Sequence, residues 1–568
     1  MAKSHALLLV FLLAQMNSQA QAGHESRESD RTPEKMASSY VPLDSWIYPA
    51  FERLVALGYV QTAYPGLRPW TRLECARLLE EAGEQIIDGT ASRETEELYG
   101  ELELEFSVEE KIFEGGANRQ IRVDAIYTRL TQIAGSPLRD GYHFAQTMVN
   151  DYGRPYASGL NSVTGVRAHA AAGPMAFYFS GEYQQAPATP RQPASVLEAM
   201  AAADGTPSLG HTLPLLAADA NSVNRFRLLD AYASSKVHSL QFSFGQQSLW
   251  LGATESGPLL FSNNAEPMLM LRVDSVSPYK IPFLSYVLGP ARSEFFIGQL
   301  SGQRWVFSPP HLYGPEINPQ PFLHGTKLSF RPTRNLEFGM GFTAQFGGPG
   351  LPFTWHNFLR TFLVHRANLA DNPAKRLSQF DLSYRIPGMR NLLTFYLDSM
   401  VIDEYSPLGS NRPSLSLGIY LAHLPKISRM DFRAEGITTD LPTMHFVPGA
   451  VYRDGRYISG DTNDGMLMGS WMGRMGQGGQ AWATYWCSPR NTIQFGYRHQ
   501  EVDQRFIGVG GGRLQDFSLR TDLLLRPDLS LGVYIQYEPW RFATLASGGQ
   551  SAVTTSLQFT FRPNWKPN

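Results

Sequence analysis

Apolar and polar residues alternate along most of the chain, from about residue 120 almost to the C-terminus. In the segment 336–346, for example, Phe338 shares one parity with other apolar residues, whereas Glu337 and Gln345 lie on the other. A period of two predicts a β-strand with one apolar and one polar environment. About 18 such segments occur, each near the roughly 9 to 11 residues that a tilted strand needs to cross a bilayer. The pattern predicts a mainly β protein, a transmembrane antiparallel β-barrel of about 18 strands over residues 118–563.

The connections between the predicted strands alternate between short and long. Outer-membrane barrels have short turns on the periplasmic side and longer loops outside the cell, with both termini on the periplasmic side. The alternation therefore supports a barrel, although the connection at 275–292 is long where the scheme expects a turn. The expected turns lie at 172–174, 332–335, 387–390, 488–490 and 527–528, and the expected loops at 134–159, 187–223, 301–323, 347–376 and 439–479.

A soluble protein with several sheets, such as a propeller or an elongated sandwich, would also alternate and is the alternative fold. Against it stands the absence of a repeat of the length of a propeller blade. Charged residues make up 18% of the chain, where soluble domains carry roughly 25%. Hairpin-connected strands with one apolar face need lipid or a partner sheet, which favours the membrane barrel.

Before residue 120 the apolar positions recur at helical spacing and predict a small α-helical periplasmic domain over residues 39–115. Gly58 stands where a left-handed C-terminal cap belongs. Thr71 and Glu74 form a capping box, in which each side chain accepts from the backbone near the other residue. The expected helices run from Trp46 to Gly58, from Thr71 to Gly83 and from about Arg93 to Leu104.

The first residues have the three parts of a secretory signal. Lys3 supplies a positive charge, residues 6–14 are apolar, and residues 20–22 offer a small-x-small cleavage site. We expect residues 1–22 to be a signal peptide and residues 23–38 a polar linker. The apolar run is shorter than the roughly 20 residues that a helical span needs. No Cys follows the predicted cleavage site, so no lipoprotein anchor is expected.

The charge and the cysteines exclude several classes of function. A formal net charge of -2 gives no electrostatic case for nucleic-acid binding. Cys75 and Cys487 form no metal-ligand cluster, and whether they pair in an oxidising compartment stays open. The acidic spacing of Asp461–Gly465 misses the EF-hand pattern, and Gly508–Gly512 lacks the Lys-Ser/Thr pair of a phosphate-binding loop. No metal and no cofactor is expected.

The connection after the strand expected at 240–244 carries a Trp-x-Gly stretch, then an apolar pair and Ser-x-Asn-Ala-x-Pro. This stretch resembles the capsule assembly protein Wzi family, and a second resemblance lies at 325–348. The resemblance covers most of the chain after residue 120. It implies an outer-membrane barrel, closed to bulk flow, that binds exported capsular or other surface polysaccharide at the cell surface and organises it there. The residues of the motif are Trp250, Gly252, Ser262, Asn263, Asn264, Ala265 and Pro267.

Residues 46–82 look like a single S-layer-homology motif. Such motifs bind cell-wall polymer, and Arg72 and Glu74 occupy the matching Thr-Arg-x-Glu positions. The resemblance implies that these two residues bind wall polymer such as peptidoglycan. The motifs usually act in sets, whereas this chain has one copy, so a helical plug or cap is the alternative. A polysaccharide export complex is the other partner considered for this domain.

Polysaccharide binding needs flat aromatic faces and planar polar groups in loops that the polymer can reach. The expected loops 439–479 and 347–376 carry both. We expect the arginines and the aspartate of the first loop to contact an acidic or hydroxyl-rich polymer. The alternative for an aromatic residue near a strand end is the interfacial girdle of a membrane protein. The candidate binding residues are Tyr452, Arg453, Asp454, Arg456, Tyr457, Trp471, Trp355 and His356.

An enzyme and a porin are the competing functions. The histidines are scattered and no Gly-x-Ser-x-Gly elbow occurs, so no catalytic residue is assigned and no enzyme is expected. The stronger rival is a passive or substrate-selective porin tethered to the wall by its N-terminal domain. Inward charges such as Arg498, Glu435 and Arg385 would line an open lumen in a porin, whereas a barrel of the resembling family should be plugged.

Overall fold

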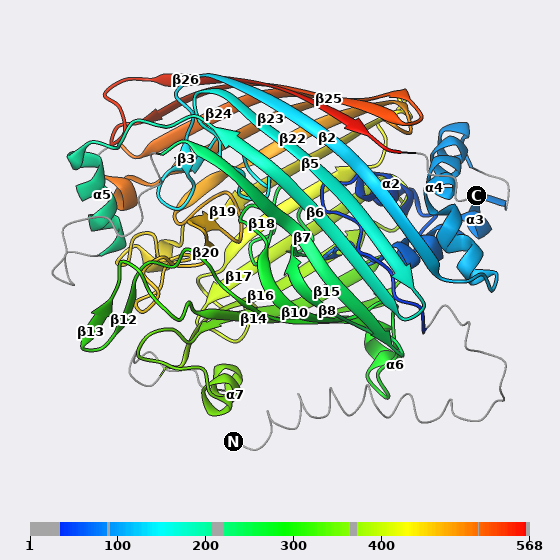
Figure 1. The fold of residues 1–568 in the computed structure, drawn as a ribbon, viewed down its shortest axis with the longest axis horizontal. Coiled ribbons are helices and arrows are strands. Elements are labelled where there is room, and N and C mark those ends of the chain that lie inside the picture. Colours follow the sequence, from blue (N-terminus) through cyan, green and yellow to red (C-terminus); the bar gives the residue numbers. More distant parts are fainter. Residues whose placement is uncertain (1–34, 88–90, 206–220, 364–371, 509, 564–568) are drawn as a thin grey trace.

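The computed structural model describes residues 35–87, 91–205, 221–363, 372–508 and 510–563. The predicted signal peptide and most of the predicted linker lie outside these residues. The largest element is one antiparallel sheet that closes on itself as a barrel (Figure 1).

Eighteen strands form the closed barrel, which confirms the predicted fold class and strand number. Each strand pairs with its neighbours in chain order, and the first strand pairs with the last to close the sheet. The barrel strands are β2 (Arg119–Gly135), β5 (Gly159–Ala172), β6 (Met175–Ala186), β7 (Val223–Val237), β8 (Leu240–Gln247), β10 (Met268–Ser275), β11 (Ala291–Gln299), β14 (Phe322–Thr333), β15 (Leu336–Phe346), β16 (Ala374–Arg385), β17 (Leu393–Ile402), β18 (Ser414–Leu421), β19 (Met430–Thr438), β22 (Gly476–Ser488), β23 (Asn491–Val502), β24 (Gly512–Arg526), β25 (Leu529–Phe542) and β26 (Gln550–Phe561).

Short turns gather at one end of the barrel, the turn end, and long loops at the other, the loop end. The chain enters β2 and leaves β26 at the turn end (Figure 1). The connection between β10 and β11 lies at the turn end although it is long, and it contains α6 (Ser285–Leu288). The loop end carries α5 (Ala194–Asp204), η3 (Pro442–Met444), α7 (Trp355–Leu363), α8 (Gln504–Ile507) and the short strand pairs β3 (Arg139–Asp140) with β4 (Ala145–Gln146), β12 (Val306–Ser308) with β13 (His311–Tyr313), and β20 (Thr462–Asn463) with β21 (Met466–Leu467).

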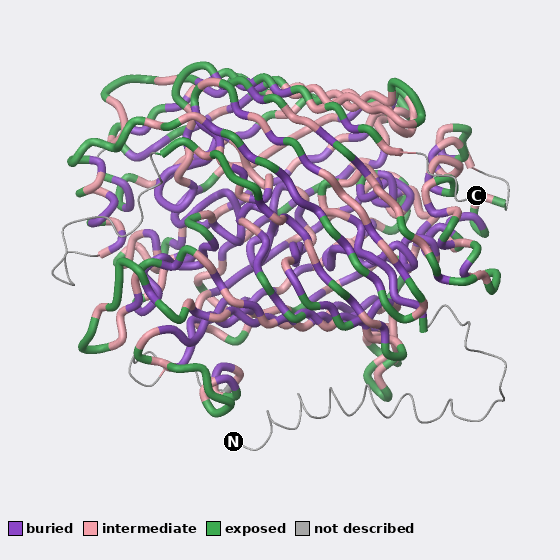
Figure 2. The backbone as a smooth tube through the Cα atoms, in the orientation of Figure 1, coloured by how far each residue is buried: buried purple, intermediate pink, exposed green. Residues whose placement is uncertain are grey.

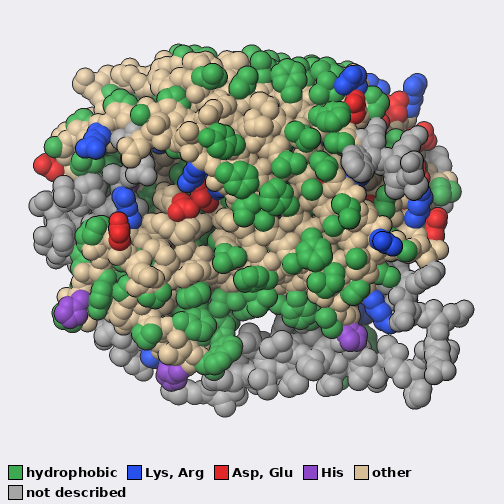
Figure 3. All heavy atoms as spheres, viewed as in Figure 1, with side chains coloured by type: hydrophobic (Ala, Val, Ile, Leu, Met, Phe, Trp, Pro, Cys, Tyr) green, Lys and Arg blue, Asp and Glu red, His purple; other side chains and the backbone are tan. Residues whose placement is uncertain are grey.

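The two parities of the strands face different surroundings. On β15, Met340 is exposed on the outer face, whereas Glu337 and Gln345 are buried in the lumen. Outward aromatic rings form rows across strands, as in Phe330, Phe338 and Phe380, whose centroids lie 5.5 and 6.2 Å apart. Hydrophobic side chains cover the middle of the visible face, and charged side chains lie mostly toward the two ends (Figure 3). This outer surface matches the hydrocarbon layer of a membrane.

In the part of the chain that the structure describes, three helices precede the barrel, with the predicted C-terminal cap at Gly58 and the Thr71 half of the predicted capping box. The Gly58 backbone has a φ of 94° and closes the first helix, and the Glu74 amide donates to Thr71 Oγ1 over 3.1 Å. Gly83 does not end the second helix, because this glycine lets the Tyr99 ring of the third helix approach closely. Among the described helices, none is long and apolar enough to cross a membrane. The three helices are α2 (Ile47–Leu57), α3 (Arg72–Ile87) and α4 (Arg93–Phe113).

The segment of residues 36–71, which we call the turn-end plug, lies inside the barrel. Ser38 already packs on the inner wall, where its amide donates to Gln241 Oε1 over 3.3 Å, so the packed chain begins before the predicted boundary at residue 39. Lys327 on β14 donates to the Gly66 carbonyl over 2.8 Å. Helices α3 and α4 cap the turn end (Figure 1). Buried residues accordingly fill the space between the barrel walls (Figure 2).

Candidate functional site

The connection between β8 and β10, residues 248–267, turns into the lumen instead of leaving the barrel. We call it the motif loop because it holds the Trp-x-Gly motif. Its strand β9 (Trp250–Leu251) pairs with β1 (Leu67–Arg68) of the turn-end plug. Gly252 has a φ of 157°, and a Cβ there would lie 2.7 Å from Asp398 Oδ2 on the wall. Only glycine fits at this close approach of loop and wall.

The second half of the motif binds the loops at the loop end. Ser262 Oγ donates to the Gly469 carbonyl over 2.8 Å, and Asn264 Nδ2 donates to the Leu467 carbonyl over 3.1 Å. The carbonyl of Asn263 accepts from the Tyr152 amide over 2.7 Å. The motif residues Trp250, Ser262, Asn263, Asn264, Ala265 and Pro267 are all buried. The motif therefore joins the turn-end plug to the loops at the loop end, and its residues are buried where a polymer cannot contact them.

The loop of residues 439–475, the loop-end plug, folds over the lumen. Trp471, Tyr452 and Tyr457 are fully buried, and the two tyrosine hydroxyls donate to the carbonyls of Leu259 and Gly347 over 2.7 and 2.9 Å. These rings cannot offer a stacking face to a sugar in this structure. The loop that carries these three predicted binding residues folds inward, so all three rings lie in the lumen filling.

The polar candidates of the same loop also serve its own conformation. Asp454 Oδ1 accepts from the backbone amides of Arg456 and Tyr457 over 2.7 and 2.8 Å, which fixes a turn. The Arg456 guanidinium is buried and donates to Ser308 Oγ over 3.2 Å. Arg453 is half-buried against the end of α5. Of the predicted binding residues, Trp355 and His356 are exposed, and they lie on α7 outside the barrel wall.

Arg72 and Glu74, predicted to bind wall polymer, are both buried between helices. The Arg72 guanidinium donates to Glu109 over 2.6 Å and to Glu105 over 3.0 Å, and it lies 4.9 Å from the centre of the Phe106 ring. Glu74 accepts two hydrogen bonds of 2.8 Å from Arg77. Arg72 thus ties α3 to α4, whereas Glu74 pairs with Arg77 within α3, and both contacts agree with the alternative of a helical cap.

A buried histidine joins the loops at the loop end. The His143 ring lies 2.7 Å from Asp140 and 3.1 Å from Asp204, and Arg474 donates to Asp204 over 2.6 Å. Burial alone would lower the pKa of His143, but the two carboxylates reverse this effect and raise the pKa to about 9. These residues come from the three loops after β2, β6 and β19, which the protonated histidine therefore ties together.

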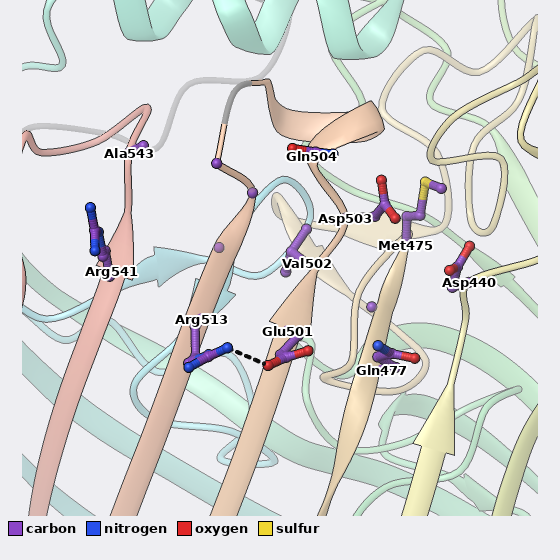
Figure 4. Close-up of a pocket in the computed structure, with 14 residues that line it drawn as sticks. Asp440, Met475, Gln477, Glu501, Val502, Asp503, Gln504, Arg513, Arg541 and Ala543 are labelled. Carbon is purple, nitrogen blue, oxygen red and sulfur yellow. Dashed lines mark ion pairs between the residues drawn. The ribbon is translucent and has the colours of Figure 1, made fainter.

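A cavity of about 630 Å³ opens at the loop-end rim, on the outside of β22 to β25 (Figure 4). Gln477, Glu501, Arg513 and Arg541 lie opposite one another on four successive strands. Glu501 pairs with Arg513 over 3.0 Å. Two like charges directly opposite, such as Arg513 and Arg541, are destabilising unless an anion or a polar ligand lies between them. We call these four residues the rim row; they line the cavity.

The rim row lies above a band of aromatic residues on the same strands. Tyr497, Phe517 and Tyr537 are also opposite one another, and the first two rings are 5.2 Å apart. Four residues separate this band from the rim row, which is about 13 Å along a strand. Aromatic residues of this kind mark the membrane interface, so the rim row lies beyond the hydrocarbon layer. The sequence contained a signal that was missed: Glu501 and Arg513 are charged residues on the mostly apolar parity.

A closed antiparallel barrel with an apolar outer face and a lumen filled by its own chain defines a plugged outer-membrane β-barrel. Residues 128–555 match the family Capsule assembly protein Wzi, and the chain belongs to that family. The resemblance that the motif loop suggested is confirmed, and the protein is placed in the outer membrane.

The chain is similar to one relative in sequence and to solved barrels in fold. The chain is 28% identical over 192 residues to an uncharacterized 55.8 kDa protein in the cps region of Klebsiella pneumoniae, a match that spans 33% of this chain and 35% of that protein. The structure of Wzi, an outer-membrane protein involved in group 1 capsule assembly in Escherichia coli and a carbohydrate-binding β-barrel, superposes with a TM-score of 0.66 at 14% identity. That superposition covers 93% of this chain and 100% of Wzi. OccAB2 of Acinetobacter baumannii gives a TM-score of 0.42 at 12% identity, over 79% of this chain and 99% of that one.

Proposed function

We propose that this barrel binds exported capsular or other surface polysaccharide at its loop end and organises it at the cell surface by non-covalent contacts, without catalysis. The rim row carries the proposal. It offers guanidinium, carboxylate and amide groups side by side on neighbouring strands (Figure 4), and its Gln477, Arg513 and Arg541 side chains are exposed. Such planar groups pair with sugar hydroxyls and with acidic sugars. The carbohydrate binding of the Escherichia coli relative supports the same reading.

The filled lumen argues against a porin. Glu435 accepts from the Ser256 amide of the motif loop over 3.0 Å, and Arg385 donates to the Val55 carbonyl of the turn-end plug over 2.8 Å. Arg498 pairs with Asp516 and with Glu538. Inward charges that would line an open channel are thus used to hold the plugs and the wall. Binding at the rim, instead of transport through the lumen, fits this arrangement.

The direct test is binding of surface polysaccharide, purified from the cells that make the protein, to the refolded full chain. Replacing both arginines of the rim row, as Arg513→Gln with Arg541→Gln, is expected to weaken binding about tenfold, because two charge-assisted contacts are lost. The matched control is Arg526→Gln, at the other end of β24, where the side chain is also exposed. The control should bind as the unchanged protein does.

Two results would contradict the proposal. Equal affinity of the double variant and the control would remove the rim row as the binding site. Large, steady conductance of the unchanged protein in a planar bilayer, unaffected by the polysaccharide, would favour a porin.

For the turn end, we propose that the helical cap of α3 and α4 faces the periplasm, where peptidoglycan or an export complex would meet it. Because Arg72 and Glu74 are engaged within the chain, such a partner would contact the outer side of α4.

A further inference from the structure

Two short helices lie outside the barrel on the same sector of its wall (Figure 1). Helix α6 belongs to the turn end and α7 to the loop end, and both are attached to β14. At the turn end, the Arg331 amide donates to the Pro290 carbonyl just after α6 over 3.1 Å. At the loop end, His324 Nε2 lies 2.6 Å from Thr361 Oγ1 of α7. Strand β14 thus contacts both helices, and Arg376 on β16 also donates to the Thr361 carbonyl of α7 over 2.6 Å.

The α6 connection exposes an unusual number of apolar side chains. Phe283 is 86% exposed, Tyr286 89% and Val287 75%, and Leu284 is also exposed. Phe283 has a φ of 64°, a strained backbone conformation for a bulky residue. In water such a cluster would be an unfavourable surface, so its position next to the apolar barrel wall points to a nonpolar environment.

Helix α7 has one continuous apolar arc, half of which is covered by the barrel. Phe358 and Phe362 pack around His324, with ring centroids 5.2 and 4.5 Å away. One step around the helix, Trp355 is 72% exposed and Leu359 is exposed as well. His356 follows on the polar side of the helix. An amphipathic helix with an uncovered apolar strip beside a lipid-facing wall is typical of helices that lie in the membrane interface.

The two attachment points are separated along the membrane normal. His324 and Arg331 are seven residues apart on β14, about 23 Å along the strand and about 17 Å along the membrane normal at a strand tilt of about 40°. Both points therefore lie within an apolar band about 25 Å tall, with one helix at each end of the barrel. We propose that α6 and α7 are paired interfacial anchors, which insert Phe283, Tyr286 and Trp355 into the lipid at the two faces of the outer membrane. The uncovered surfaces are continuous with the lipid-facing wall, exemplified by Met340, which is why lipid is the occupant.

Spin labels on the full chain in phosphatidylethanolamine and phosphatidylglycerol vesicles test the proposal. The background is Cys487→Ser, which leaves only the buried Cys75. Labels are attached in Trp355→Cys and in Tyr286→Cys, with Met340→Cys as the lipid reference and the exposed loop position Glu316→Cys as the water reference. The measured quantity is the collision rate with oxygen, which concentrates in lipid, relative to a water-soluble nickel chelate.

At both helix positions we expect an oxygen-to-nickel ratio between the two references and at least about threefold above that of Glu316→Cys, as the interface requires. A ratio equal to that of Glu316→Cys at either position would overturn the pairing, because that helix would lie in water. Protection from both reagents would overturn the choice of lipid and indicate a protein partner, such as a second copy of the chain. Tyr286→Ala, at the turn end, should leave polysaccharide binding in detergent unchanged, which separates this proposal from the function of the rim row.

Discussion

The two plugs fill one lumen with a different balance of charged and apolar contacts, although Asp461 of the loop-end plug also pairs with Lys375 on the wall. The turn-end plug contacts the wall through charges: Glu52 accepts from Arg433 over 2.7 Å, and the Arg272 guanidinium lies 4.1 Å from the Tyr40 ring. The loop-end plug packs through an apolar cluster that includes Trp471, Met468 and Leu259. Truncating a side chain in an apolar cluster lowers the free energy of unfolding in proportion to the apolar volume removed. Removing one partner of a buried ion pair leaves the other charge buried without compensation, which is costly by itself. The difference can be measured by substitutions at each plug.

The largest effect is expected from Trp471→Ala in the loop-end plug. The ring is fully buried, and the Arg498 guanidinium lies 5.2 Å from its centre. Loss of a buried aromatic side chain should lower the free energy of unfolding by about 3 to 5 kcal/mol, measured by denaturant titration in micelles. Trp355→Ala, on the outside of the barrel, should cost less than about 1 kcal/mol. An effect of Trp471→Ala as small as that of Trp355→Ala would show that the Trp471 ring in the loop-end plug does not stabilise the protein.

A slightly smaller effect is expected from Arg433→Met in the wall beside the turn-end plug. The substitution leaves Glu52 with Arg68 alone and should cost about 3 kcal/mol, because breaking a buried pair leaves a charge without its partner. The control is Arg429→Met, whose half-exposed guanidinium lies 3.5 Å from Glu94 and contributes at most about 1 kcal/mol.

Because the plugs lie in series, each variant alone should keep the low conductance expected of the unchanged protein. A channel opened by either substitution would contradict that arrangement.

The third effect depends on pH and concerns the ties between loops. The folded pKa of His143 is about 9, above the ordinary value of about 6.5, so the stabilisation is complete below pH 6.5 and is lost as the pH rises toward 9. The loss is at most about 3 kcal/mol. Protease cleavage of the loop after β2 should accelerate between pH 7 and pH 9.5. The variant His143→Gln should be cleaved at a rate that lacks this rise, and an identical pH profile in both proteins would assign the effect to another group.

The smallest effect is expected at the start of α3, where the turn-end plug ends. Thr71→Ala removes the hydroxyl that accepts from the Glu74 amide and should cost about 1 kcal/mol. Thr71→Ser keeps the hydroxyl and should lie within about 0.5 kcal/mol of the unchanged protein. Thermal unfolding followed by circular dichroism would resolve the difference. A Thr71→Ser protein as unstable as Thr71→Ala would mean that the methyl group, which packs in a buried position, matters more than the cap.

The barrel could be predicted because its physics is local. The position of a residue such as Met340 or Gln345 relative to the sheet follows from parity alone, and a membrane enforces this parity over every strand. The helix caps at Gly58 and Thr71 are equally local. The predicted end of α3 at Gly83 was wrong, because the helix continues to Ile87 and Gly83 instead lies against the Tyr99 ring of α4. The sequence gives no direct sign of that contact between helices.

The candidate site was less predictable because it depends on where a loop folds. Tyr452 and Trp471 have the composition expected of a sugar-binding loop, but the same composition builds a plug when the loop turns inward. The apolar neighbours of these residues, such as Met468 and Met472, were the available sign of an inward fold. Glu501 and Arg513 were detectable in principle, since charges on the lipid-facing parity need an aqueous surrounding.

The contact between the two ends of the sheet has a consequence for biogenesis. Tyr127 on β2 lies opposite Thr560 on β26, so the wall becomes continuous only after the last strand has been synthesised and paired. Residues 36–71 come before β2 in the chain, yet they lie enclosed by that wall. Capture of this segment while the seam between β2 and β26 is still open avoids threading it into a finished cylinder. The strand pair of Arg68 with Trp250 would then act as an early template for the sheet that grows around it.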